Sequence, residues 1–201
     1  MQPTIGILAL QGDFSAHKRA VERTGGIPVE IRAGVDFGRI DGLIIPGGES
    51  TTMLKLLREE QLLQPLIDFG QAKPVFGTCA GAILLARRVL HPEQESLGLL
   101  DLTVERNGYG RQIDSRIVQL DLEGQPVEAV FIRAPVIRQA GADVRVLLAY
   151  RGDPVLVEQG RHMAATFHPE LTSDTRIHQY FTDKVATHSE PLEKLANTSI
   201  R

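Results

Sequence analysis

Apolar and polar residues are arranged differently in the two halves of the chain. In the first half, short apolar runs alternate with stretches whose apolar residues recur every three or four positions, which is typical of strands followed by helices. The strands expected here are residues 4–10, 29–32, 42–45 and 74–77. The helices expected are residues 14–24, 51–60, 63–69 and 79–88. Strands that alternate with helices predict a parallel sheet covered on both faces.

The second half consists mostly of closely spaced strand-like runs separated by turn signals such as Glu123–Gly124. The runs expected to form strands are residues 102–105, 117–120, 130–133, 144–150, 155–158 and 164–167. Such spacing predicts antiparallel meanders that extend or complete the sheet. Residues 172–187 are expected to form a last helix. Together the two halves predict an α/β protein: a three-layer α/β/α sandwich with a mixed, mainly parallel central sheet.

Length and composition indicate an ordinary globular protein. The chain has 201 residues, of which 42% are hydrophobic and 23% charged, and we expect a single domain over residues 1–188. The polar tail, residues 189–201, has the composition of a partly disordered segment. A net charge of -3 argues against a nucleic-acid or membrane partner. A single cysteine, with no apolar stretch long enough to span a bilayer and no signal peptide, predicts a cytoplasmic protein.

Cys79 lies where an expected strand meets an expected helix, in the segment Gly77-Thr-Cys-Ala-Gly81. Small residues two positions to either side permit the tight turn of a nucleophile elbow. The helix N-terminus that follows favours a thiolate, and the amide of Ala80 could donate to an oxyanion. The alternative is that Cys79 is a small buried hydrophobe. The elbow spacing favours a nucleophile.

A second candidate segment, His168-Pro-Glu170, follows an expected strand. Two residues that are two positions apart in an extended segment point to the same side, so Glu170 can orient His168 and support its cationic form. The segment alone could be a surface turn. With an elbow cysteine upstream, Cys79, His168 and Glu170 form a plausible nucleophilic set. The other histidines lack this arrangement, and no cluster has the spacing of a metal site.

These two motifs resemble those of the triad-type, class I-like glutamine amidotransferases, a resemblance that implies a flavodoxin-like sandwich. In that family a cysteine attacks the side-chain amide of glutamine, ammonia leaves, and a glutamyl thioester is hydrolysed. Four further segments narrow the resemblance to the glutaminase subunit of pyridoxal 5'-phosphate synthase, and they spread it over most of the chain. They are Leu8-Ala-Leu-Gln-Gly12, Pro46-Gly-Gly-Glu-Ser-Thr-Thr-Met53, Arg106-Asn-Gly-Tyr-Gly-Arg-Gln112 and Phe131-Ile-Arg-Ala-Pro135.

The resemblance also implies a glutamine site. Gly48, Glu49 and Ser50 would contact the substrate, with the Glu49 carboxylate on its α-ammonium group. An amide of Gly47 or Gly48 would be the second oxyanion donor beside Ala80. Arg106, Ile132 and Arg133 would line the site, the arginines facing the α-carboxylate. The simpler alternatives are an N-cap at Ser50 or Thr51 and solvated surface arginines.

The expected partners are L-glutamine and a separate synthase subunit that receives the ammonia; no cofactor or metal is expected. By resemblance, Gln11, Gly12 and Asp13 face that synthase; otherwise they form a turn, with Asp13 as a helix cap. Three rivals remain open. One is another cysteine-elbow α/β hydrolase, although the distant histidine disfavours it. The others are a non-enzymatic interaction subunit and a glutaminase that serves a different synthase.

Overall fold

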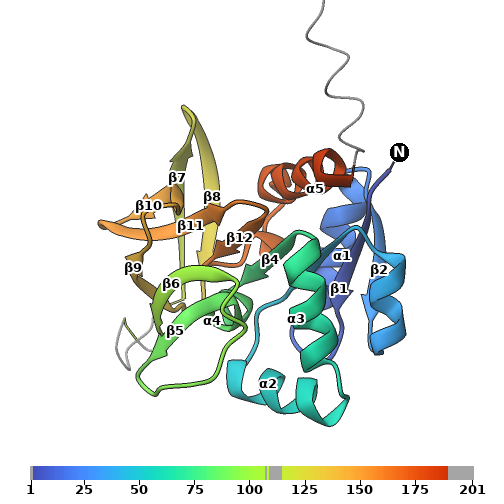
Figure 1. The fold of residues 1–201 in the computed structure, drawn as a ribbon. Coiled ribbons are helices and arrows are strands. Elements are labelled where there is room, and N and C mark those ends of the chain that lie inside the picture. Colours follow the sequence, from blue (N-terminus) through green and yellow to red (C-terminus); the bar gives the residue numbers. More distant parts are fainter. Residues whose placement is uncertain (1, 107, 109–114, 190–201) are drawn as a thin grey trace, which may run out of the picture.

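The central feature of the fold is a seven-stranded mixed sheet (Figure 1). The computed structural model describes residues 2–106, 108 and 115–189. The strand order is β10-β11-β12-β4-β3-β1-β2, in which the five strands from β12 to β2 are parallel and β10 and β11 are antiparallel additions at one edge. The strands are β1 (Thr4–Leu8), β2 (Ile27–Ile31), β3 (Gly42–Ile45), β4 (Val75–Thr78), β10 (Arg145–Tyr150), β11 (Asp153–Gln159) and β12 (His162–Ala165). This arrangement confirms the predicted mixed, mainly parallel sheet.

Helices cover both faces of this sheet. They are α1 (Phe14–Arg23), α2 (Ser50–Glu59), α3 (Leu63–Ala72), α4 (Ala80–Leu85) and α5 (Arg176–Ser189). Apolar residues of α2, α3 and α4 belong to one buried cluster, and those of α1 and α5 belong to another. Figure 1 accordingly shows α3 on one side of the sheet and α1 and α5 on the other. Two short 3-10 helices, Gly34–Arg39 and Pro169–Leu171, complete the helical elements.

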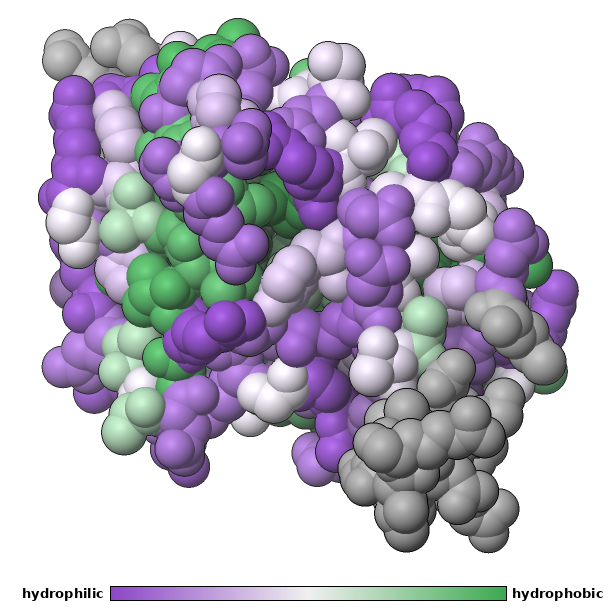
Figure 2. Space-filling view, turned by 90° about the horizontal axis from the view of Figure 1, so that it is seen from above, coloured by the Kyte–Doolittle hydropathy of each residue, from purple (hydrophilic) through white to green (hydrophobic). Residues whose placement is uncertain are grey.

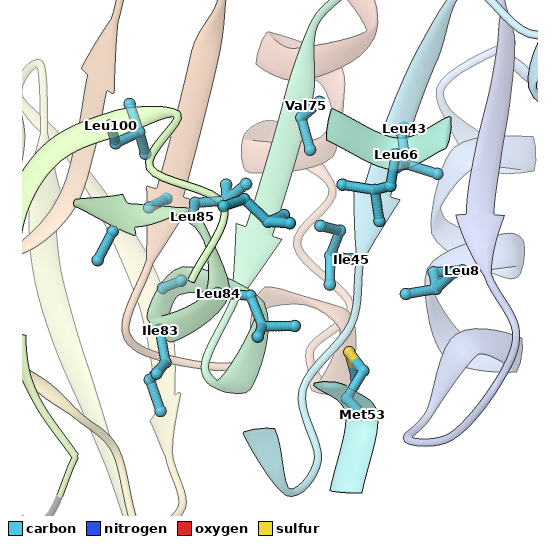
Figure 3. Packing of buried hydrophobic residues seen from close by; sticks show 14 of the residues in the cluster. Leu8, Leu43, Ile45, Met53, Leu66, Val75, Ile83, Leu84, Leu85 and Leu100 are labelled. Atoms are coloured by element: carbon cyan, nitrogen blue, oxygen red, sulfur yellow. The ribbon is translucent and has the colours of Figure 1, made fainter. Parts of the chain in front are cut away.

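Strand β3 shows how the sequence pattern produces these layers. Leu43 and Ile45 pack into the cluster with α2 and α3, whereas Ile44 packs into the cluster with α1 and α5. Neighbouring side chains of a strand point to opposite faces, so an unbroken apolar run is what a strand covered on both faces requires. Figure 3 shows Leu43, Ile45 and Val75 of the strands gathered with Met53 of α2 and Leu66 of α3 in this cluster.

The middle of the chain, residues 86–140, differs from the prediction. It builds two further sheets, β5-β6-β9 and β7-β8, rather than only extending the central one. Their strands are β5 (Ala86–Leu90), β6 (Leu100–Glu105), β7 (Arg116–Leu122), β8 (Gln125–Phe131) and β9 (Val136–Ala140). β5 and β9 were not predicted, and the helix predicted over residues 79–88 is wrong beyond Leu85. Residues 86–90 instead pair with β6, which buries Val89 beside Val104.

The β7-β8 hairpin leaves part of its apolar surface open. Val118, Leu120 and Leu122 are only partly buried where they pack against the core, and Ile117 is exposed. Seen from above (Figure 2), apolar surface gathers in the left half of the molecule, the half in which Figure 1 shows β7, β8, β10 and β11. Among the described residues, no helix has both the length and the apolar character needed to cross a membrane. The predicted polar tail lies outside the described residues, except for Ser189, which ends α5.

Candidate functional site

Cys79 occupies a strained turn between β4 and α4. It is the N-cap of α4 and has φ 48° and ψ -102°, a left-handed conformation that is uncommon for a residue other than glycine. A hydrogen bond from its amide to the Ala165 carbonyl, 2.8 Å long, ties the turn to β12. A Cβ at Gly81 would collide with the carbonyl oxygen of Ile45, so only glycine lets α4 begin this close to the sheet. These contacts form the elbow predicted from the sequence.

His168 and Glu170 lie immediately after β12, the strand next to β4. The His168 amide donates to the Val130 carbonyl at 2.8 Å, which fixes the backbone. The imidazole Nδ1 lies 2.7 Å from Glu170 Oε1, the ring edge at Cε1 and Nδ1 borders Gly47, and the ring also hydrogen-bonds the Cys79 side chain. Glu170 is buried, with a side chain only 1% exposed. The structure therefore brings the three residues of the predicted triad together.

The electrostatics of these residues favour a charged pair. Burial alone would lower the pKa of His168, but hydrogen bonds with Cys79 and Glu170 outweigh it and raise the pKa to about 10. Burial tends to raise the pKa of Glu170, yet its histidine neighbours, His17 and His168, hold it below the usual value. An ionised Glu170 thus supports a cationic His168, which places a positive charge next to the Cys79 side chain.

The loop after β3 forms one wall of the site. A Cβ at Gly47 would meet the His168 ring and lie 3.3 Å from the Cys79 Cβ, so the backbone passes directly in front of both side chains. Ala80, which follows Cys79 directly, is the first residue of α4. The first N–H groups of a helix have no partner within the helix. The structure thus places both predicted oxyanion-donor segments next to Cys79.

A pocket of about 360 Å³ opens in front of Cys79 and His168. Its volume is at the small end of the range for small-molecule sites. Besides these two residues, the lining includes all of the substrate-binding residues predicted by resemblance: Gly48, Glu49, Ser50, Arg106, Ile132 and Arg133. Gln11, Gly12 and Ile83 also line it. The sequence offered no sign of Ile83, which is reached only because the first turn of α4 faces the pocket.

Two of the pocket residues bind each other. Arg106 Nη2 lies 2.7 Å from Glu49 Oε1, and the Arg106 side chain is only 12% exposed. Glu49 is also the N-cap of α2, because its carboxylate accepts the Thr52 amide at 2.8 Å. Its pKa is lowered: burial acts to raise it, but the hydrogen bonds from Thr51 and Thr52 and the charge of Arg106 prevail. The predicted N-cap at Ser50 or Thr51 is therefore wrong by one or two residues.

The remaining predicted residues are placed as follows. Ser50 Oγ donates to Gln94 Oε1 at 2.8 Å, so its proton is already used and only its oxygen can still accept a hydrogen bond. Asp13 is the N-cap of α1, because its carboxylate accepts the Ala16 amide at 3.0 Å, which is the simpler of the two alternatives for this residue. Gln11 Nε2 donates to the Glu49 carbonyl at 3.1 Å, so Gln11 and Gly12 belong to the pocket wall. Asn107 and residues 109–112 of the predicted central segment lie outside the described residues.

Two histidines that the sequence did not single out as a site lie behind the triad. His17 of α1 and His178 of α5 are 0% and 1% exposed, and their rings lie 2.9 Å apart between Nδ1 of His17 and Nε2 of His178. His17 Nε2 lies 3.4 Å from Glu170 Oε2 and 3.2 Å from Thr78 Oγ1. The two residues are 161 positions apart in the chain, so no local motif reveals the pair.

The sequence is similar to a known protein family and to named members of it. Residues 7–187 match the model of the SNO glutamine amidotransferase family. The protein "Pyridoxal 5'-phosphate synthase subunit PdxT" of Solibacter usitatus is 58% identical over 189 residues, covering 90% of this chain and 98% of that protein. The protein of the same name from Kosmotoga olearia is 47% identical over 186 residues, covering 90% and 97%.

Solved structures agree with these sequence relationships. A crystal structure described as a glutamine amidotransferase superposes with a TM-score of 0.85 at 46% identity, covering 90% of this chain and 98% of that one. PurLQS from Thermotoga maritima superposes with a TM-score of 0.64 at 18% identity, covering 97% and 100%. At that identity the second likeness concerns the fold alone, and it confirms the predicted three-layer architecture.

Proposed function

The chain belongs to the SNO glutamine amidotransferase family, and on that premise we propose that it is the glutaminase subunit of a pyridoxal 5'-phosphate synthase. In this role it hydrolyses L-glutamine to L-glutamate and ammonia. The observation that carries the proposal is the juxtaposition of Cys79, His168 and Glu170 beside a small pocket that Cys79 and His168 line, in a chain 58% identical over 189 residues to a protein named as a subunit of pyridoxal 5'-phosphate synthase.

Cys79 is the nucleophile of this reaction. Its thiolate attacks the side-chain carbonyl carbon of glutamine, and the negative charge moves to the carbonyl oxygen. The amide of Ala80 and one amide of the Gly47–Gly48 segment stabilise that oxygen, because both segments border Cys79. Collapse of the tetrahedral intermediate breaks the C–N bond and leaves a glutamyl thioester on Cys79.

His168 is the general acid and base. Its raised pKa keeps it protonated at neutral pH, so it can give its proton to the departing ammonia. It then takes a proton from water, which attacks the thioester and releases glutamate. Glu170 accepts from His168 Nδ1 at 2.7 Å, which leaves Nε2 for Cys79, the leaving group and the water.

The pocket supplies groups that match the backbone of a free amino acid. Glu49 is ionised and faces the pocket, which suits the α-ammonium group of glutamine. Arg106 and Arg133 also line the pocket, and a guanidinium can bind a carboxylate through two hydrogen bonds. The Glu49–Arg106 ion pair orients both groups before the substrate arrives. Ile132 and Ser50 complete the walls.

The ammonia goes to a separate synthase subunit. The relatives from Solibacter usitatus and Kosmotoga olearia are named as subunits of pyridoxal 5'-phosphate synthase, which supports a hetero-oligomeric assembly for this chain. The division of labour requires no cofactor on the glutaminase itself. We place the activity in the cytoplasm, since Cys79 must stay reduced to act as a nucleophile.

Glutamate release from glutamine, measured with and without the synthase subunit, tests the proposal. We expect the wild-type complex to hydrolyse glutamine and the Cys79→Ala complex to lose the activity while still assembling. Unchanged hydrolysis by Cys79→Ala would overturn the assignment of the nucleophile. If the wild type neither binds the synthase subunit nor changes its rate in its presence, the subunit assignment is wrong, and a glutaminase for another synthase becomes the better account.

A further inference from the structure

A buried chain of polar groups continues from the triad into the protein interior. Glu170 Oε1 is taken by His168, but Oε2, which is also buried, makes no hydrogen bond of regular geometry. The group facing it is His17 Nε2, at 3.4 Å. His17 in turn lies 2.9 Å from His178. A buried carboxylate oxygen without a donor is costly, so the contact with His17 matters more than its length alone indicates.

The distances allow one consistent direction of hydrogen bonding. If His178 carries its proton on Nε2, it donates to Nδ1 of His17. His17 then carries its proton on Nε2, where Glu170 Oε2 and Thr78 Oγ1 share it, at 3.4 and 3.2 Å. His178 Nδ1 is left as a buried acceptor, in keeping with its lack of a hydrogen-bond partner. The donated protons of both His178 and His17 then point toward Glu170.

Both rear histidines are neutral at pH 7. Burial lowers the pKa of His17 despite the opposing attraction of Glu170, and the cationic His168 lowers it further, while Asp13 acts in the opposite direction. Burial also lowers the pKa of His178, to about 3, with His17 and Arg23 acting the same way and Glu170 opposing. His17 therefore supports Glu170 as a fixed N–H donor rather than as a second positive charge.

We propose that His17 is a positioning residue of the glutaminase, which holds the inner oxygen of Glu170 through Nε2–H and is itself held by His178. The role rests on the proposed function, because it acts through Glu170 on His168. Losing this donor favours neutral Glu170, which no longer supports a cationic His168. The charged Cys79–His168 pair then forms only at higher pH.

Two isosteric substitutions separate the donor from the bulk of the side chain. The amide nitrogen of Gln reaches the position of Nε2, so His17→Gln can keep the donor to Glu170. The amide of Asn reaches only the position of Nδ1, so His17→Asn keeps the contact with His178 and loses the one with Glu170. His162→Leu is the matched control. It removes another buried histidine, which accepts the Val75 amide at 3.2 Å and lies at the start of β12, the opposite end of the strand from His168 and Glu170.

The rate of iodoacetamide alkylation against pH is the decisive readout, because Cys79 is the only cysteine in the chain. It requires neither glutamine nor the synthase subunit. We expect His17→Asn to be alkylated about tenfold more slowly at pH 7 and its profile to move up by about one pH unit, as for the loss of one hydrogen bond to a charged group. His17→Gln and His162→Leu should follow the wild-type profile.

Steady-state kinetics of the complex with the synthase subunit give the second readout. We expect His17→Asn to lower kcat with little change in KM, because His17 does not border the pocket. We also expect the acidic limb of its kcat–pH profile to shift to higher pH. If folded His17→Asn has the pH profile of the wild type, the proposal is wrong. If His17→Asn and His17→Gln lose equal amounts of activity, the role of His17 is packing, and the proposal is wrong as well. If Cys79→Ala keeps full activity, the proposed function fails instead, and the alkylation profiles still test His17.

Discussion

The two sides of the His168–Glu170 pair are built differently. In front, toward Cys79, lies an open pocket with charged walls, in which Glu49 is half exposed and paired with Arg106. Behind, His17 and His178 are fully buried and carry no charge at pH 7. The front must admit a charged amino acid and release two products, whereas the rear must keep one carboxylate ionised and still. Changes in front should therefore alter substrate handling, and changes behind should alter ionisation and stability.

The largest effect is expected at the residue where the two sides meet. His168→Asn removes the group that protonates ammonia and activates water, so glutamine hydrolysis should fall by about a thousandfold or more. The thermal unfolding temperature should change little, because the ring borders the pocket. Coupled glutamate detection in the assembled complex measures the rate of hydrolysis, and calorimetry measures the unfolding temperature. Activity within tenfold of wild type would mean that another group acts as the base.

The next largest effect is expected from the front wall. Gly47→Ala places a methyl group against the His168 ring, and displacement of the ring by about 1 Å should lower kcat by roughly a hundredfold. Gly38→Ala is a suitable control, because a Cβ there meets nothing within 4 Å. The two variants should be compared by glutamine kinetics in the complex. Equal activity in both would show that the loop moves away from His168 during turnover.

The rear should control stability in acid. The pKa of His178 is lowered to about 3 from 6.5, so below pH 6.5 the unfolded chain takes up a proton that the folded chain refuses. Its contribution to stability is complete above pH 6.5 and decreases as the pH falls toward 3. At pH 5 the loss amounts to about 2 kcal/mol. Urea unfolding at pH 7.5 and 5 should show a pH-dependent loss about 2 kcal/mol smaller in His178→Phe, and an identical loss would contradict the buried neutral state.

The smallest effect is expected at the mouth of the pocket. Arg106→Met removes a charged partner of Glu49 and, by our proposal, of the substrate carboxylate, so KM for glutamine should rise about tenfold while kcat changes little. Arg87→Met is the matched control, because Arg87 also forms an ion pair, with Asp101 at 2.9 Å, but is 72% exposed and does not line the pocket. A rise in KM that is equal in both variants would argue against a substrate contact.

The front of the site could be read from the sequence, and the rear could not. Cys79, His168 and Glu170 each lie within short motifs at the ends of strands, and parallel strands bring such ends to one edge of a sheet. His17 and His178 lie within helices and meet only through tertiary packing. No spacing rule joins them. The Glu49–Arg106 pair is a similar case, since it depends on a contact across 57 positions.

The fold divides in the same way. The parallel half was predictable because the period of each apolar run distinguishes its strands from its helices. β5 was missed because it follows α4 directly and begins with Ala86, Arg87 and Arg88, which are good helix formers. The pairing with β6 that overrides this preference is set by residues further along the chain. β9 was missed for a related reason: its last three residues are exposed, so it lacks the apolar run that identified the other strands.

The central claim is that Cys79 forms a glutamyl thioester with the help of His168 and Glu170. Mass spectrometry of the wild-type complex, quenched in acid during turnover of glutamine, tests it most directly. We predict an adduct of glutamyl mass on the peptide that contains Cys79, which hydroxylamine removes and which Cys79→Ala lacks. An adduct on a different residue, or undiminished glutamine hydrolysis by Cys79→Ala, would contradict the account.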